Sequence, residues 1–302
     1  MTAKKRLCYY DSMTDTLYIR KGDTVNQYFI CYPGFRRKAL TLSYDDGVVQ
    51  DIRLMEIMDR HGIKGTFNLN SGSFDGHDFR SANTRMTREE AVALYKNSGH
   101  EVAVHSRCHP FLEQLPQGVA AWEIVKDREL LENIFGGIIR GMAYPMGTFS
   151  DDVVTTLRQC GIAYARTVKV HRTFELPKDW LRLESTCRNK DPELMSICDR
   201  FLNLKPTWGP KLFYMWGHSY EFDEPGGWET IEAFCKKMGG HADIWYATNI
   251  EIYDYLEAAG RIQSSVNGSR LYNPTNTTLY LRVGKDKHCI FAPGETLELQ
   301  TL

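Results

Sequence analysis

Short apolar runs alternate with longer segments of helical period between about residue 38 and residue 260. The runs are rich in strand-forming residues, as in Ala39-Leu40-Thr41-Leu42-Ser43-Tyr44, and are typical of buried strands. The segments between them place apolar residues three or four positions apart, as at Ile52 and Met55, which indicates helices with one buried face. Seven or eight strand–helix repeats predict a parallel sheet closed into a distorted (β/α)7-8 barrel of the α/β class.

The boundaries of these elements follow from turn and capping signals. Thr87-x-x-Glu90 is a capping box that predicts a helix start, and Gly62, Gly99 and Gly161 predict helix ends. The expected strands are 39–44, 66–69, 101–104, 140–144, 164–168, 181–185, 212–216 and 244–247. The expected helices are 51–61, 87–99, 119–134, 151–160, 192–201, 228–238 and 250–259.

Both ends of the chain depart from the barrel pattern. Residues 6–32 alternate polar with aromatic or β-branched positions, which predicts an N-terminal β-hairpin extension over residues 1–37. Residues 38–260 form the expected barrel. Residues 261–302 contain three short strand patterns separated by Asn273-Pro274 and Pro293-Gly294, which predicts a C-terminal antiparallel β appendage.

Composition narrows the classes of function. With 302 residues, 42% of them hydrophobic, the chain can bury one large domain, and a net charge of -1 gives no field that would attract nucleic acid or an anionic membrane. The eight cysteines include no Cys-x-x-Cys pair, and no apolar run has the length of a signal or a membrane span. We therefore expect a soluble cytoplasmic protein with reduced thiols. Self-association is left open.

Polar residues that can do chemistry follow four of the predicted strands. They are Asp45-Asp46-Gly47, His105-Ser106-Arg107-Cys108-His109, Tyr144-Pro145-Met146-Gly147 and Trp216-Gly217-His218. In a parallel barrel these segments gather at the C-terminal ends of the strands, which is where binding and catalytic groups lie.

The acidic pair and the histidine pair together indicate a metal site. Adjacent partly buried carboxylates repel each other, and a divalent cation removes that cost. His105 and His109 are four residues apart, so a helical turn after the strand would place both imidazoles on one face. One carboxylate with two imidazoles leaves coordination positions open for water and a substrate oxygen.

Three motifs are similar to those of the polysaccharide deacetylase superfamily, the carbohydrate esterase family four-like proteins. Thr41-Leu42-Ser43-Tyr44-Asp45-Asp46-Gly47 resembles their first motif, His105-Ser106-Arg107-Cys108-His109 their His-Ser/Thr-x-x-His motif, and Met215-Trp216-Gly217-His218 their closing motif. The resemblance covers about residues 38 to 255.

This resemblance implies a role for each residue. Asp45 is the general base, Asp46, His105 and His109 hold one divalent metal ion, and His218 is the general acid. Zinc is the expected metal, with cobalt, nickel, manganese and iron as alternatives. Tyr144 and Trp216 are expected to line the side of the site that binds substrate. For Trp216 the alternative is a role in core packing.

Two departures from the family pattern concern the groups around the base and the acid. The third motif carries an arginine three residues before the residue whose backbone N–H faces the oxyanion, but aligning Met146 on that residue puts Ala143 in the arginine position. Arg140 is the candidate replacement, with a structural role as its alternative. Asp179 is the candidate to orient His218, with a solvated loop position as its alternative.

The expected activity is removal of an N- or O-linked acetyl group from a carbohydrate or a related small amide. Three other readings stay open: hydrolysis of cyclic or other non-sugar C–N bonds on the same barrel, a degenerate carbohydrate-binding relative, and an iron oxygenase, which also uses two histidines and a carboxylate. The predicted alternation of strands and helices is evidence against an iron oxygenase.

Overall fold

The largest sheet is a ring of parallel strands. The computed structural model describes residues 8–11, 16–21, 24–25, 28–75, 85–284 and 287–299. Neighbours in the ring follow the order β10-β9-β8-β7-β6-β5-β12-β11. Its strands are β5 (Lys38–Asp45), β6 (Gly65–Leu69), β7 (Glu101–Val104), β8 (Gly141–Ala143), β9 (Tyr164–Val170), β10 (Leu183–Ser185), β11 (Cys187–Arg188) and β12 (Lys211–Gly217).

One short stretch of chain closes the barrel. β10 pairs with β9 and β11 pairs with β12, and only Thr186 separates β10 from β11. The backbone N–H of Thr186 donates to the carbonyl of Tyr214 at 2.8 Å, so the stretch passes from one neighbour to the other. The predicted α/β class and distorted barrel are therefore confirmed. β13 (Ile244–Tyr246) adds a parallel pair to the start of β5.

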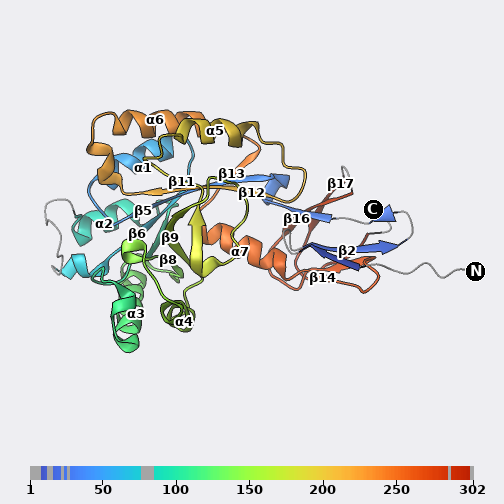
Figure 1. Ribbon diagram of the computed structural model, residues 1–302, viewed down its shortest axis with the longest axis horizontal. Helices are drawn as coiled ribbons and strands as arrows, with labels where there is room; N and C mark the ends of the chain where they lie inside the picture. The colour runs from blue at the N-terminus through green and yellow to red at the C-terminus, as the bar shows by residue number, and fades with distance from the viewer. Residues whose placement is uncertain are drawn as a thin grey trace, which may run out of the picture.

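Helices cover the outside of the ring (Figure 1). They are α1 (Gln50–Arg60), α2 (Arg88–Tyr95), α3 (Gln117–Phe135), α4 (Asp151–Gln159), α5 (Leu194–Asn203), α6 (Gly227–Met238) and α7 (Asn249–Gly260). The capping box of Thr87 and Glu90 forms as expected, and Thr248 with Glu251 forms a second one at the start of α7. None of the helices in the described residues is long and apolar enough to cross a bilayer.

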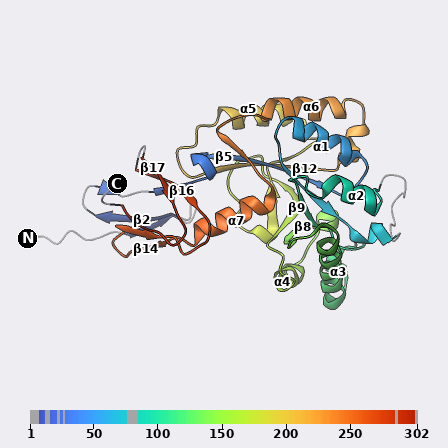
Figure 2. The same ribbon diagram turned by 180° about the vertical axis from the view of Figure 1, so that it is seen from behind.

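The antiparallel strands gather at one end of the molecule, beyond α7 (Figures 1 and 2). One sheet joins β4 (Tyr28–Cys31), β16 (Leu279–Val283) and β17 (Lys287–Phe291), and so unites segments from both ends of the chain. The other short strands are β1 (Cys8–Asp11), β2 (Thr16–Lys21), β3 (Thr24–Val25), β14 (Gln263–Ser264), β15 (Arg270–Tyr272) and β18 (Thr296–Glu298). The expected N-terminal extension also includes residues 1–7, 12–15, 22–23 and 26–27, which lie outside the described residues.

Two apolar cores hold this arrangement together. The larger one lies between the barrel strands and the helices α1 to α6, and the smaller one joins α7 to the antiparallel strands through Tyr255, Leu281 and Phe291. The hydroxyl of Tyr255 donates to the carbonyl of Cys31 in β4 and accepts from the N–H of Tyr280 in β16. The appendage is thereby fixed to the N-terminal end of the barrel, and the C-terminal ends of the strands stay open.

Candidate active site

Asp45 and Asp46 reach the same side of the barrel because the strand ends between them. Successive side chains of a regular strand point to opposite faces, so two adjacent carboxylates converge only where the backbone turns. Asp45 is the last residue of β5, and Asp46 has φ of 85° in the left-handed region. Aspartate tolerates this region better than most residues. The N–H of Asp46 still donates to the carbonyl of Asn68 in β6 at 3.0 Å, which fixes the turn.

His105 and His109 lie on a loop, and the helical turn considered for this segment does not form. Ser106 and His109 have φ of 60° and 55°, which a right-handed helix does not allow. The amide of Asn70 donates to the carbonyls of His105 and Ser106, and the carboxylate of Glu123 accepts from the N–H of Cys108. These bonds hold the loop, and they bring both imidazoles to one place without helical spacing.

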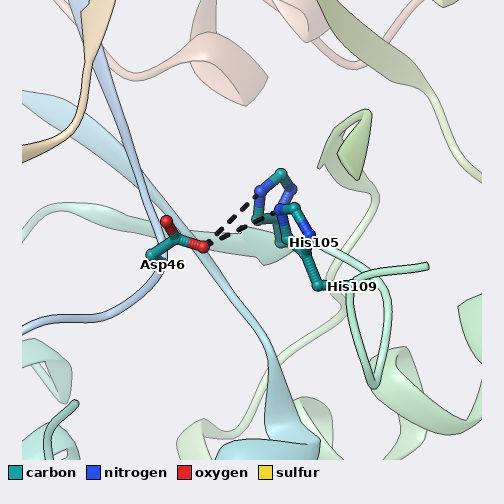
Figure 3. Close-up of side chains that lie close together, drawn as sticks. All are labelled: Asp46, His105 and His109. Atoms are coloured by element: carbon teal, nitrogen blue, oxygen red, sulfur yellow. Dashed lines mark ion pairs between the residues drawn. The ribbon is translucent and has the colours of Figure 1, made fainter. Parts of the chain in front are cut away.

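Asp46, His105 and His109 form a compact donor set (Figure 3). Oδ1 of Asp46 lies 3.9 Å from Nε2 of His105 and 3.8 Å from Nε2 of His109. These gaps are too long for hydrogen bonds, whereas a cation with ligand bonds of about 2.0–2.2 Å on each side fills them. Nδ1 of His105 donates to the carbonyl of Ala143 at 2.8 Å, which leaves its Nε2 as the acceptor facing Asp46. The three residues therefore fit one divalent ion.

Arg85 also contacts Asp46. Its guanidinium lies 3.1 Å from Oδ1 of Asp46 and donates to the backbone carbonyl of the same residue. Burial alone would raise the pKa of Asp46, but His105, Arg85 and the other neighbouring histidines outweigh it and lower the pKa to about 2. Burial has the opposite effect on His105 and lowers its pKa. Asp46 is therefore an anion and His105 a neutral imidazole at neutral pH.

Asp45 makes an ion pair and a hydrogen bond with residues that Asp46 does not contact in this way. Its Oδ2 pairs with the guanidinium of Arg166, and its Oδ1 accepts from the amide of Asn68 at 2.8 Å. Burial alone would raise the pKa of Asp45, but Arg166 and the histidines 105 and 218 outweigh it, so the pKa lies below its ordinary value.

Arg166 was missed in the sequence because it lies inside an apolar strand. It is 1% exposed, and its guanidinium also stacks 4.1 Å from the ring centre of Trp216. A fully buried guanidinium requires a buried anion as its partner. The arginine within the apolar stretch Ala165-Arg166-Thr167 was therefore the signal in the sequence for such an ion pair. Arg140, the predicted replacement, instead pairs with Asp254 of α7 at 2.6 Å, and the structure gives it no contact with Asp45.

His218 follows β12 and faces both aspartates. Its Nε2 lies 3.8 Å from Oδ2 of Asp45 and 4.0 Å from Oδ2 of Asp46. Its Nδ1 lies 3.6 Å from Oε1 of Glu221, a carboxylate that Arg188 holds at 2.7 Å. Burial alone would lower the pKa of His218, but Glu221 and the two aspartates outweigh it, so the pKa lies above its ordinary value.

Glu221, and not Asp179, is the carboxylate beside His218. Asp179 accepts from the N–H of Leu181 at 2.9 Å and pairs with Arg182 at 2.5 Å, contacts that cap a short turn. Burial raises the pKa of Glu221, but His218 and Arg188 lower it to about 2 overall. The signal for Glu221 was its position three residues after His218, which lets its side chain fold back on the histidine.

These groups surround one cavity of about 220 Å³ at the C-terminal ends of the strands. Tyr144, Met146 and Trp216, the residues predicted for the substrate side, all line it. The hydroxyl of Tyr144 donates to the carbonyl of Leu181, and Met146 has φ of 58°. Tyr220 stacks on His218 with ring centres 5.0 Å apart and forms part of the rim. Asp46, Ser106, His109 and Met146 all have positive φ, and such backbone strain is typical of functional sites.

Comparison with known proteins points to one family. Residues 33–165 match the family model of polysaccharide deacetylase. A comparison with curated proteins gives no match. The barrel is similar to that of a protein from Mycobacterium smegmatis described as a polysaccharide deacetylase, with 14% identity, coverage of 76% of this chain and 93% of that one, and a TM-score of 0.55.

Two further solved structures are similar to this chain. A family 4 carbohydrate esterase from Streptomyces lividans, in complex with acetate, has 15% identity, coverage of 70% and 92% of the two chains, and a TM-score of 0.46. The deacetylase PplD of Streptococcus pyogenes, also in complex with acetate, has 19% identity and a TM-score of 0.39, and the match covers 42% of this chain and about half, 55%, of that one. The family model thus matches the first part of the barrel, residues 33–165, and the Mycobacterium smegmatis structure shares the fold.

Proposed function

We propose that this chain is a metal-dependent hydrolase that removes an N- or O-linked acetyl group from a carbohydrate or a related small molecule. The observation that carries the proposal is the convergence on one 220 Å³ cavity of a candidate base, a candidate acid and a metal donor set. These groups come from strand ends far apart in the sequence. Their shifted pKa values place Asp45 as an anion and favour the protonated form of His218 near neutral pH.

Asp46, His105 and His109 would hold the ion. When bound, a divalent cation of this kind supplies Lewis acidity, polarising an acyl oxygen and lowering the pKa of a water molecule. The fixed tautomer of His105 and the depressed pKa of Asp46 keep both residues in the protonation state that a metal ligand requires. The donor set does not distinguish zinc from cobalt, nickel, manganese or iron.

Asp45 acts as the base in this proposal. It accepts a proton from water while the water oxygen forms a bond to the acetyl carbon, and Arg166 keeps its carboxylate in place for that transfer. The backbone N–H of Met146 is the proposed donor to the oxyanion that develops on the acetyl oxygen. Tyr144 and Trp216 confine the small acyl group beside these atoms.

His218 acts as the acid. It donates its proton to the leaving nitrogen or oxygen while the bond from that atom to the acetyl carbon breaks, which gives acetate and the free amine or alcohol. Glu221 is the positioning residue that stabilises the protonated imidazole, and Arg188 holds Glu221. Asp45 and His218 thus have opposite roles in one turnover, in agreement with the opposite signs of their pKa shifts.

Acetate release from N- and O-acetylated sugar oligomers tests this function. Asp45→Asn should lower turnover by at least about 100-fold and leave the metal bound. Asp152→Asn, at an exposed position of α4, is the matched control and should leave turnover unchanged. Unchanged turnover in Asp45→Asn would refute the role of the base.

Two further assays separate the alternative functions. Ring opening of cyclic amides without acetate release would assign the chain to the non-sugar C–N hydrolases. Binding of an acetylated sugar without turnover in the metal-loaded protein would make it a carbohydrate-binding relative.

A further inference from the structure

A second and larger cavity lies at the opposite end of the barrel from the candidate active site. It has a volume of about 620 Å³ and includes Lys38, the first residue of β5, whereas Asp45 is the last residue of that strand. Seven residue steps at about 3.3 Å each separate these two positions by roughly 23 Å. The cavity is therefore distinct from the active site, and the proposed hydrolysis makes no use of it.

Three parts of the chain build the walls. The segment 34–38 leads into β5, the segment 204–206 follows α5, and Ala242 with Asp243 precedes β13. His288 of β17 completes the lining from the C-terminal appendage. The cavity thus lies where the barrel meets the antiparallel strands, a common position for ligand sites in proteins of more than one unit.

The cavity carries an excess of positive charge. Arg36, Arg37, Lys38 and Lys205 line it, and Asp243 is the one carboxylate in the lining. Lys38 is almost fully buried and pairs with Asp243 at 2.7 Å, so these two charges compensate each other. Three cationic side chains are left around one concavity, in a chain whose net charge is -1.

No carboxylate within the described residues neutralises these three cations. Arg36 donates to the backbone carbonyls of Pro33 and Ala242, which accept hydrogen bonds but carry no net charge. The side chains of Arg37 and Lys205 make no hydrogen bond or ion pair with any described residue. Like charges held together in this way repel one another, and a bound anion would remove the repulsion.

Aromatic packing holds the wall that carries Arg36 and Arg37. Phe35 has φ of 63°, an unusual value for a bulky residue, and it follows Gly34 at φ of 73°. The ring of Phe35 stacks on His288 with ring centres 4.6 Å apart, and its edge packs against Tyr280 at 5.1 Å. The surrounding structure therefore fixes a strained turn, a feature that clusters at ligand-binding segments. The result is a preformed aromatic face beside the guanidinium groups.

We propose that this cavity binds a small anion with two or more linked phosphate groups. A single charge would leave most of the cationic excess uncompensated, whereas a diphosphate carries several negative oxygens at the spacing of adjacent side chains. Arginine is suited to such a ligand because its planar guanidinium donates two parallel hydrogen bonds to phosphate oxygens. The Phe35–His288 stack gives a nucleoside diphosphate an additional surface on which a base can pack.

Calorimetric titration of the full chain with inorganic pyrophosphate and with ADP tests this proposal. Both probes should bind, and the double variant Arg37→Gln/Lys205→Gln should weaken each by at least about tenfold. The matched control Lys96→Gln/Lys126→Gln removes two cations elsewhere, the exposed Lys96 and the half-buried Lys126, and should change the affinity less than about twofold. Tighter binding of ADP would identify a nucleotide, and equal binding would identify the phosphates alone.

Two further measurements distinguish binding in this cavity from binding at the metal site and from an effect of misfolding in the double variant. His109→Ala should retain pyrophosphate binding, because the donor set lies at the other end of β5. Wild-type affinity should fall as salt rises from about 0.05 to 0.5 M, because the attraction is electrostatic. Absence of binding to both probes, unchanged affinity in the double variant, or loss of binding in His109→Ala would overturn the proposal.

Discussion

Ala143 of β8 and Arg166 of β9 are register partners in the parallel β8–β9 pair. Partner residues on adjacent strands present their side chains to the same face of a sheet. By the resemblance to polysaccharide deacetylases, Ala143 takes the position of the arginine of their third motif, and we infer that the guanidinium of Arg166, on the neighbouring strand at the same level, replaces it. It pairs with Asp45, the candidate base.

Replacing Arg166 should therefore affect both the reaction and the fold. Arg166→Met should lower kcat by at least about 100-fold, because the carboxylate of Asp45 loses its cation. It should also lower the free energy of unfolding by about 3–5 kcal/mol, because a buried anion is left unpaired. Acetate release and denaturant unfolding measure the two effects.

Placing the arginine at position 143 instead of position 166 tests whether the two positions are equivalent. Ala143→Arg/Arg166→Ala should recover at least about tenfold in kcat over Arg166→Ala, since the new side chain leaves the same face of the sheet. Arg140→Ala is the control and should stay within about twofold of the wild type, because an exposed ion pair contributes little. A larger loss in Arg140→Ala than in Arg166→Met would contradict the assignment.

Glu221 should set the alkaline limit of activity through His218. The acid must be protonated, and Glu221 contributes to the raised pKa of His218, so activity extends to higher pH than an ordinary histidine allows. Glu221→Gln removes the negative charge and should move the alkaline limb of the kcat profile to lower pH. Asp179→Asn should leave this limb in place. A shift with Asp179→Asn and none with Glu221→Gln would reverse the two assignments.

Asp51 of α1 should make stability depend on pH. It is fully buried and accepts from the hydroxyl of Tyr95 at 2.5 Å, and burial is the main cause that raises its pKa to about 7. A raised carboxyl pKa contributes stability below the unfolded value near 4, and this contribution is lost as the pH rises to about 7. Relative to Asp51→Asn, the free energy of unfolding should fall by about 4 kcal/mol over this range. A constant difference from pH 4 to pH 8 would contradict the raised pKa.

Strand-end reasoning could predict the part of the site that depends on topology. Asp45 ends a barrel strand and Asp46, His105, His109 and His218 follow one, and the C-terminal ends of parallel strands meet at one face. The strands predicted from the apolar runs were therefore enough to place these residues at one site. The local backbone was harder to predict, because the left-handed turns at Ser106 and His109 depend on bonds from Asn70 and Glu123.

The ion pair of Arg166 with Asp45 could not be predicted from sequence, because the two residues are distant in the chain. Arg166 is 121 positions from Asp45, and its place inside an apolar strand indicates a buried anion without indicating which carboxylate it is. The same reason explains the β4–β16 pair, where segments treated as two separate appendages form one sheet. Pairings of this kind follow from the closed barrel, which brings both ends of the chain to one place.

Metal-dependent hydrolysis is tested by measuring metal content and acetate release on the same protein preparations. The purified protein should bind about one divalent ion per chain, and the double variant His105→Ala/His109→Ala should lose both the ion and turnover. His61→Gln, which changes a half-buried histidine on α1's C-terminal side, should retain both. Bound metal and acetate release should disappear together, and only in the double variant. Release at the wild-type rate from a double variant without metal would contradict it.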